Sequence, residues 1–240
     1  MIDTILFDLD GTLIRYTQKA FLACYVDAIS KVFSQKGMDV DRVIEALWIA
    51  RDAMIRNDGS ELNSQRFWEV FGGRLELSAD EIVRFDATCE EFYRDGFNVV
   101  KSVMEPTDIS QRLVRAVREK GYTLVLATSP IFPVSAVATR LKWIGLDTPD
   151  FDLVTHYENS SYSKPDLGYY REIFDKLGKT PEQCLMVGNS LTEDMCAGEL
   201  GAETFLVTDY LEDGAGVDLA GLRHGTLVEA EAWLLALPEL

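Results

Sequence analysis

Two aspartates, Asp8 and Asp10, stand directly behind the apolar run Ile5-Leu6-Phe7 near the start of the chain. Side chains at positions i and i+2 of a strand point the same way, so both carboxylates can share one small volume at the strand's end. Like charges held that close need a cation or a shared proton, and oxygen ligands with no histidine or cysteine nearby favour Mg²⁺. Gly11 permits a tight turn behind them, and the following amides could hold an anion. The alternative is an acidic surface loop, but such loops seldom follow an apolar run directly.

Three later segments repeat this succession of an apolar strand and polar residues. The pairs are Tyr122–Ala127 with Thr128 and Ser129, Phe151–Val154 with Ser163 and Lys164, and Cys184–Gly188 with Asn189 and Asp194. Ligand groups in open α/β sheets gather at the carboxyl ends of the strands. We therefore expect the three segments to converge on Asp8 and Asp10.

Together these residues resemble the four motifs of the haloacid dehalogenase (HAD) superfamily, and most closely those of its cap-bearing phosphatases. The first motif, D-x-D-G-T, matches residues 8–12, the second, a Ser or Thr after a strand, matches Thr128, and the third matches Lys164-Pro165. The fourth, a strand followed by G-D-x-x-x-x-D, matches residues 188–194 with Asn189 in place of the first aspartate. The resemblance spans nearly the whole chain.

The resemblance implies a mechanism in which Asp8 attacks phosphorus and forms an aspartyl-phosphate. Asp10 would first protonate the leaving alkoxide and then deprotonate the attacking water. Thr128 and Ser129 would bind the phosphoryl group, and Lys164 would supply fixed positive charge both to it and to the nucleophile.

The resemblance also implies a Mg²⁺ site whose ligands are Asp8, Asp10, Asn189 and Asp194, the last through water. Asn189 brings an amide oxygen without formal charge, so metal affinity should be lower than with aspartate. The same substitution leaves open a member of the superfamily that does not catalyse. The Ser-x-x-Glu spacing of Ser190 and Glu193 favours a capping box that opens a helix over a metal role for Glu193.

Composition is compatible with a cytoplasmic enzyme. The chain has 240 residues, 47% of them hydrophobic, and a net charge of −17 without a local run of Lys or Arg, which argues against nucleic acid or an anionic membrane as partner. Four cysteines without paired spacing indicate reduced thiols and hence the cytoplasm. We expect no leader peptide and no membrane span. No feature indicates the oligomeric state.

Strands of about five residues alternate with helices of about twelve, which predicts an α/β fold with a Rossmann-like parallel sheet. The core helices are expected over Asp108–Lys120, Pro133–Ile144, Asp166–Leu177, Leu191–Leu200 and Thr226–Leu237, with a further strand over Glu203–Val207. The core domain therefore comprises residues 1–15 and 106–240.

Residues 16–105 form an insertion with helical periodicity throughout, which predicts a four-helix-bundle cap domain. A capping box at Ser78 and Glu81 opens its last helix. Four polar residues near its helix ends are expected to be solvated: Arg51, Arg56, Asn57 and Arg66. The tryptophans at 48, 68, 143 and 233 fall on helical patterns and indicate packing.

We therefore expect a Mg²⁺-dependent phosphatase that hydrolyses a small phosphate monoester through an aspartyl-phosphate at Asp8. A phosphomutase would retain the same motifs, and a catalytically weak HAD-like binding protein would follow if Asn189 disables metal binding. Carbon–halogen hydrolysis needs neither a metal nor a leaving-group acid, so Asp10 and Asp194 argue against it.

Overall fold

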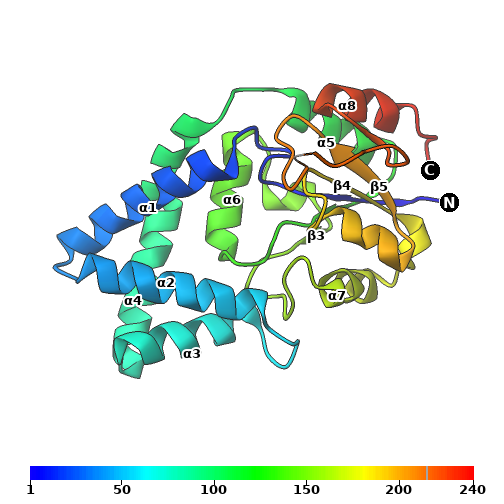
Figure 1. Cartoon of the computed structure of the whole chain (residues 1–240). Helices are drawn as coiled ribbons and strands as arrows, with labels where there is room; N and C mark the ends of the chain where they lie inside the picture. The colour runs from blue at the N-terminus through cyan, green and yellow to red at the C-terminus, as the bar shows by residue number, and fades with distance from the viewer. Residues whose placement is uncertain (215) are drawn as a thin grey trace.

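A six-stranded parallel sheet forms the centre of the computed structural model, which describes residues 1–214 and 216–240 (Figure 1). The strands are β1 (Thr4–Phe7), β2 (Thr123–Leu126), β3 (Leu153–Val154), β4 (Cys184–Gly188), β5 (Glu203–Val207) and β6 (His224–Gly225). Their order is β3-β2-β1-β4-β5-β6, and each neighbouring pair is parallel. The predicted α/β class and parallel sheet are confirmed, with β6 as a short strand that the sequence did not predict.

The register of the sheet places the first, second and fourth motifs at its carboxyl edge. Phe7 of β1 is aligned with Leu126 of β2 on one side and with Val187 of β4 on the other. The residues that follow these three strands therefore leave the sheet at the same level. Since β1 lies between β2 and β4, Asp8 stands at the middle of that edge.

Both faces of the sheet are covered, which explains why the strands are continuous apolar runs. Alternate strand residues, such as Ile5 and Phe7, pack with α5 (Ile109–Glu119), α6 (Val134–Trp143) and α8 (Leu227–Leu235). Their neighbours, such as Leu6, pack on the other face with α7 (Leu167–Leu177) and η4 (Met195–Leu200). Two further 3₁₀ turns are η2 (Thr148–Asp150) and η3 (Pro181–Gln183).

The helix expected over Leu191–Leu200 is absent in that form. Residues 191–194 are a turn, and the regular part is the 3₁₀ helix η4. Ser190 Oγ accepts the N–H of Glu193 at 3.0 Å, but the reciprocal bond of a capping box does not form. The N–H of Ser190 instead donates to Oδ2 of Asp194 at 3.0 Å. Asp194 therefore accepts the hydrogen bond from the N–H of Ser190 that Glu193 would accept in a capping box.

The insertion between β1 and α5 is helical, as predicted. It comprises α1 (Gln18–Gln35), α2 (Val40–Ile55), α3 (Asn63–Leu75), α4 (Ala79–Arg94) and the 3₁₀ segment η1 (Gly96–Val103). These helices gather on the side of the molecule opposite the two termini (Figure 1). The capping box at the start of α4 is confirmed: the N–H of Ser78 donates to Glu81 at 2.8 Å, and the N–H of Glu81 donates to Ser78 at 3.4 Å.

Two expectations about the chain as a whole can be compared with the described residues. The four cysteines are free thiols, and Cys184 is buried in β4 as expected. No helix within residues 1–214 or 216–240 has the length and apolar character needed to cross a membrane.

Candidate active site

Asp8, Lys164 and Asp194 form a buried cluster at the carboxyl edge of the sheet. Lys164 Nζ donates to Oδ1 of Asp8 at 2.9 Å and to Oδ1 of Asp194 at 2.6 Å. The side chains of Lys164 and Asp194 are each 1% exposed, so these bonds form largely out of water. One ammonium group between two carboxylates leaves one negative charge without a partner.

These surroundings raise the pKa of the Asp8 carboxyl. The pKa of this carboxyl is raised to about 8, chiefly by burial and also by the nearby Asp194 and Asp10, whereas Lys164 opposes the shift. The Oδ2 atom of Asp8 forms no hydrogen bond with the described residues, and Asp8 lines a cavity. Asp8 therefore presents one free oxygen to whatever occupies that cavity.

Asp10 is held by two residues that sequence reasoning missed. The buried guanidinium of Arg140, from α6, donates to Oδ2 of Asp10 at 2.5 Å, and the hydroxyl of Tyr16 donates to Oδ1. Arg140 is fully buried on the face of α6 that also carries Ala136 and Val137. A charged residue on the apolar face of a helix was the available sequence signal. Both oxygens of Asp10 are thus engaged.

Thr128 and Ser129 line the same cavity as Asp8. Two hydrogen bonds hold the loop that carries them. The carbonyl of Thr128 accepts one from the hydroxyl of Thr155 at 2.7 Å and one from the hydroxyl of Tyr169 at 3.0 Å. Thr128 is itself buried. The structure therefore brings the second motif to the nucleophile predicted from the first.

Asn189 joins the first and fourth motifs. Its Oδ1 accepts the hydroxyl of Thr12 at 3.1 Å, and its Nδ2 donates to the carbonyl of Tyr210 at 2.7 Å. The amide lies across Gly11, where a Cβ would come within 2.3 Å of Nδ2 and where φ is +80°. Gly11 is thus required both for the turn and for the close approach of Asn189.

Two glutamates add negative charge to the cavity. Glu193 comes from the turn after β4, and Glu212 follows β5, with its N–H donating to the carbonyl of Asn189 at 2.8 Å. Burial raises the pKa of both carboxyls, and that of Glu212 reaches about 7 as Glu193 and Asp213 add to the effect. Glu212 was not predicted, because an acidic residue in a loop carries no distinguishing sequence signal.

The donors around Asp8 match the chemistry of a hard divalent cation. They are all oxygens, and the negative charge exceeds what Lys164 neutralises. The other expected ligands already accept hydrogen bonds: both carboxylate oxygens of Asp10 and of Asp194, and the amide oxygen of Asn189. Within the described residues, no group of three acidic, histidine or cysteine side chains is arranged to hold a metal. The oxygen donors and the charge around Asp8 are thus of the kind that Mg²⁺ binds, but among the expected ligands Asp8 alone offers a free oxygen in the described residues.

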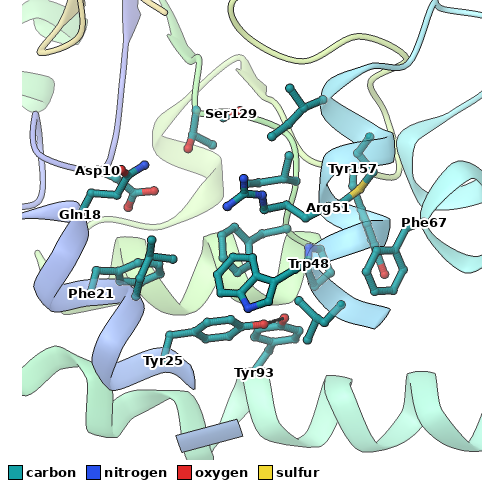
Figure 2. Close-up of a pocket in the computed structure, with 18 of the residues that line it drawn as sticks. Asp10, Gln18, Phe21, Tyr25, Trp48, Arg51, Phe67, Tyr93, Ser129 and Tyr157 are labelled. Carbon is teal, nitrogen blue, oxygen red and sulfur yellow. Dashed lines mark hydrogen bonds between the residues drawn. The ribbon is translucent and has the colours of Figure 1, made fainter. Parts of the chain in front are cut away.

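A cavity of about 260 Å³ unites these residues. It is lined at one end by Asp8, Asp10, Thr128, Ser129, Asn189 and Asp194, and toward the insertion by aromatic side chains, several of which are shown in Figure 2. Lys164 lies behind Asp8 and contacts it directly. Arg51 and Trp48 of α2 line the cavity as well, so the expectation that Arg51 is merely solvated is wrong.

The fold and the motifs define a haloacid dehalogenase-type hydrolase, and comparison with known proteins agrees. The family model described as haloacid dehalogenase-like hydrolase matches residues 2–200, so the chain belongs to that family.

Several relatives and solved structures resemble the chain over most of its length. A phosphoglycolate phosphatase of Aliivibrio fischeri is 28% identical over 207 residues, which cover 86% of this chain and 84% of the relative. The pyrophosphatase PpaX of Bacillus velezensis is 24% identical over 204 residues, covering 85% and 82%. The crystal structure of a HAD phosphatase from Thermococcus onnurineus superposes with a TM-score of 0.61 at 20% identity, covering 100% of both chains.

Proposed function

We propose that the chain is a phosphatase that hydrolyses a small phosphate monoester through an aspartyl-phosphate at Asp8. The observation that supports this most strongly is the buried Asp8–Lys164–Asp194 cluster, whose one free nucleophilic oxygen faces a cavity shared with Thr128. The names of the two curated relatives, a phosphoglycolate phosphatase and a pyrophosphatase, agree with phosphate chemistry.

Each polar residue has a role in this reaction that follows from its surroundings. Lys164 orients Asp8 and offsets the repulsion between its carboxylate and a phosphate dianion. Thr128 and Ser129 donate hydrogen bonds to the phosphoryl oxygens. Asp10 donates a proton to the leaving oxygen and then accepts one from water, in an orientation set by Arg140 and Tyr16.

Mg²⁺ is the proposed cofactor, held by Asp8 with Asp10, Asn189 and Asp194. When bound, it would neutralise the excess negative charge around Asp8 and the charge on the transferring phosphoryl group. The aspartate side chains would share their hydrogen-bonded oxygens with it. Asn189 lowers the charge of this ligand set, which predicts weaker binding than an aspartate would give.

We further propose that residues 16–105 are a cap domain on a core of residues 1–15 and 106–240. The aromatic walls of the cavity come mainly from α1, α2 and α3, whereas the nucleophile comes from the core. A cap in this position excludes water from the reaction and selects the leaving group. The four free thiols suit a reducing compartment, and we propose the cytoplasm.

Two alternatives would use the same residues. A phosphomutase would pass the phosphoryl group from Asp8 to a sugar hydroxyl, and a binding protein would recognise the phosphate without turnover. The aromatic walls offer few partners for the hydroxyl groups of a sugar, so we favour hydrolysis over phosphoryl transfer.

Hydrolysis of an aryl phosphate tests the proposal, with the wild type, Asp8→Asn and Asn189→Asp each measured with Mg²⁺ and with EDTA. We expect wild-type turnover that requires Mg²⁺ and that falls to background in Asp8→Asn. Turnover that survives Asp8→Asn would contradict the proposal. Turnover in Asn189→Asp alone would favour a binding protein, and halide release from a chloroalkanoate that ignores EDTA would favour dehalogenation.

A further inference from the structure

The cavity has two chemically different ends. Near Asp10 and Ser129 it is polar, whereas the part toward the insertion is walled by aromatic rings, which include those of Phe21, Tyr25, Trp48, Phe67, Tyr93 and Tyr157 (Figure 2). The phosphoryl group belongs at the polar end, where Asp8 and Thr128 lie. The leaving group of the substrate must therefore occupy the aromatic end.

The aromatic end offers little polar recognition. The hydroxyls of Tyr25 and Tyr93 lie 2.9 Å apart and share one hydrogen bond, and the stacked rings of both residues line the cavity. Both are buried, as is Phe21, which stacks on Tyr16 with ring centroids 5.1 Å apart. Trp48 and Phe67 are only partly buried and form the more accessible part of the wall.

Charge in the cavity disfavours a second anionic group. Of the described residues that line it, Arg51 alone is cationic, and Asp52 already pairs with its guanidinium at 2.9 Å. That guanidinium also lies 5.0 Å from the centre of the Trp48 ring. At the polar end, Glu193 and Glu212 line the cavity without a cationic partner among the described residues, so a substrate carboxylate or a second phosphate would find no countercharge there.

From this arrangement we infer that the preferred substrates are phosphate monoesters of an apolar alcohol that carries an aromatic or similarly sized hydrocarbon group. The volume of about 260 Å³ is sufficient, since an apolar cavity of roughly 150 Å³ can hold benzene. This inference rests on the proposed phosphatase function. It also distinguishes the chain from what its relatives' names suggest, because both phosphoglycolate and pyrophosphate carry a second anionic group and no hydrocarbon ring.

A matched pair of alkyl phosphates tests the inference without a change in leaving-group chemistry. We would compare kcat/KM for 2-phenylethyl phosphate and ethyl phosphate, whose leaving alkoxides are similarly basic, and include phosphoglycolate and pyrophosphate. We expect 2-phenylethyl phosphate to be preferred over ethyl phosphate by roughly 10- to 100-fold, because the ring leaves water for the aromatic wall. Both doubly anionic compounds should be poorer still.

Substitutions in the aromatic wall test whether these residues cause the preference for the phenyl group. Trp48→Ala and Phe67→Ala should each lower the 2-phenylethyl to ethyl ratio severalfold. Val83→Ala, an exposed position of α4 outside the cavity, should leave the ratio unchanged. If a variant of the aromatic wall fails to fold, the 2-phenylethyl to ethyl ratio of the wild type still tests the inference.

Binding separates failure of this inference from failure of the proposed function. The affinities of 2-phenylethylphosphonate and ethylphosphonate, measured by calorimetry, do not depend on turnover. Turnover of every ester without a preference for the phenyl group would overturn the inference and leave the phosphatase in place. Absence of all turnover, with tighter binding of the phenyl phosphonate, would overturn the phosphatase and support an apolar ligand. Equal binding of the two phosphonates would overturn the inference in either case.

Discussion

At Asp8, burial and charge oppose ionisation. The carboxyl has a pKa of about 8 in the folded protein against 3.8 for an unperturbed aspartate, so the folded state binds this proton more tightly than the unfolded chain does. The stabilisation that results is fully present below about pH 4 and is lost as the pH rises through 8. The nucleophile of the proposed reaction is therefore also a source of instability at alkaline pH.

Asp8→Asn should consequently become more stabilising as the pH rises. We expect its melting temperature to equal that of the wild type near pH 4 and to exceed it at pH 8 by at least about 3 to 6 °C, because even one pKa unit of the shift corresponds to about 1.4 kcal/mol. Calorimetric melting curves across this range provide the measurement. Asp27→Asn, in an exposed pair with Lys31, serves as the control. A difference between wild type and Asp8→Asn that does not change with pH would contradict this account of Asp8.

Asn189 holds the loop after β5 through a donor that aspartate lacks. In Asn189→Asp, a carboxylate oxygen would face the carbonyl of Tyr210, which should cost about 1–3 kcal/mol without metal. The added charge should at the same time tighten Mg²⁺ binding, so Mg²⁺ should raise the melting temperature of the variant more than that of the wild type.

A thermal titration with MgCl₂ and with EDTA checks both effects of Asn189→Asp. Asn159→Asp is the matched control, because its Nδ2 likewise donates to a carbonyl, that of Val154 at 2.8 Å, but it does not line the cavity. The control should lose stability without gaining a response to Mg²⁺. An equal response of Asn189→Asp and wild type to Mg²⁺ would show that Asn189 lies outside the metal site.

Residues identified by a short motif could be predicted from the sequence, whereas those defined by the cavity could not. The first, second and fourth motifs lie directly after strands, so the sheet brings them together. Arg140, Glu212 and Arg51 come from a helix face, a loop and the insertion, and only the tertiary packing places them at the cavity. Trp48 has the helical spacing of a packing residue, and nothing in that spacing distinguishes a cavity wall from a core.

Among the elements, the connection from β1 to α1 has a direct part in the site. It carries Tyr16, whose hydroxyl donates to Asp10, while Arg140 of α6 holds the other oxygen of the same carboxylate. The orientation of the proposed acid and base thus depends on both the start of the insertion and a core helix.

Tyr16→Phe should lower kcat by about tenfold, the effect of one lost hydrogen bond of about 1.4 kcal/mol, with little change in KM. Steady-state kinetics with an aryl phosphate would measure both constants. Tyr122→Phe is the matched control, since it removes a hydroxyl that donates to the carbonyl of Pro238, outside the cavity. Equal losses in the two variants would argue against a role for Tyr16 in orienting Asp10.

Whether a segment forms a helix or a strand could be predicted where a single local sequence signal determines it. The strands are apolar runs because both faces of the sheet are covered, and α4 begins at a capping box that forms as expected. The prediction over Leu191–Leu200 was wrong because Asp194 competes for the N–H of Ser190, a long-range consequence of its bond with Lys164. The strand β6 has only the two residues His224 and Gly225, too few for a recognisable pattern.

At the scale of the whole molecule, one buried amide ties the insertion to the core. Asn63, at the start of α3, is 0% exposed, and its Nδ2 lies within hydrogen-bonding distance of the carbonyls of Pro130 and Tyr162 and of the hydroxyl of Ser163. These residues adjoin Ser129 and Lys164. The insertion is therefore attached to the two loops that carry the proposed phosphate-binding residues.

Asn63→Ala should loosen this attachment. We expect a loss of about 1–3 kcal/mol in stability and faster amide exchange at Ser64 and over residues 157–163, because the N–H groups of positions 63 and 64 donate to the backbone carbonyls of Ser160 and Tyr157. Hydrogen–deuterium exchange with mass spectrometry would locate the change. Gln65→Ala, which removes a side chain that caps the N–H of Leu62, is the control within the same turn. Unchanged exchange over residues 157–163 would mean that other contacts hold the insertion in place.

The central claim is that Asp8 carries the phosphoryl group during turnover. The most direct test is an acid quench of the enzyme during steady-state hydrolysis of an aryl phosphate, followed by borohydride reduction and peptide mass spectrometry. An aspartyl-phosphate at Asp8 would appear as homoserine at that position, and we predict this product in the wild type but in neither Asp8→Asn nor an unreacted sample. Active turnover that leaves Asp8 unmodified, or that modifies a different residue, would contradict the account.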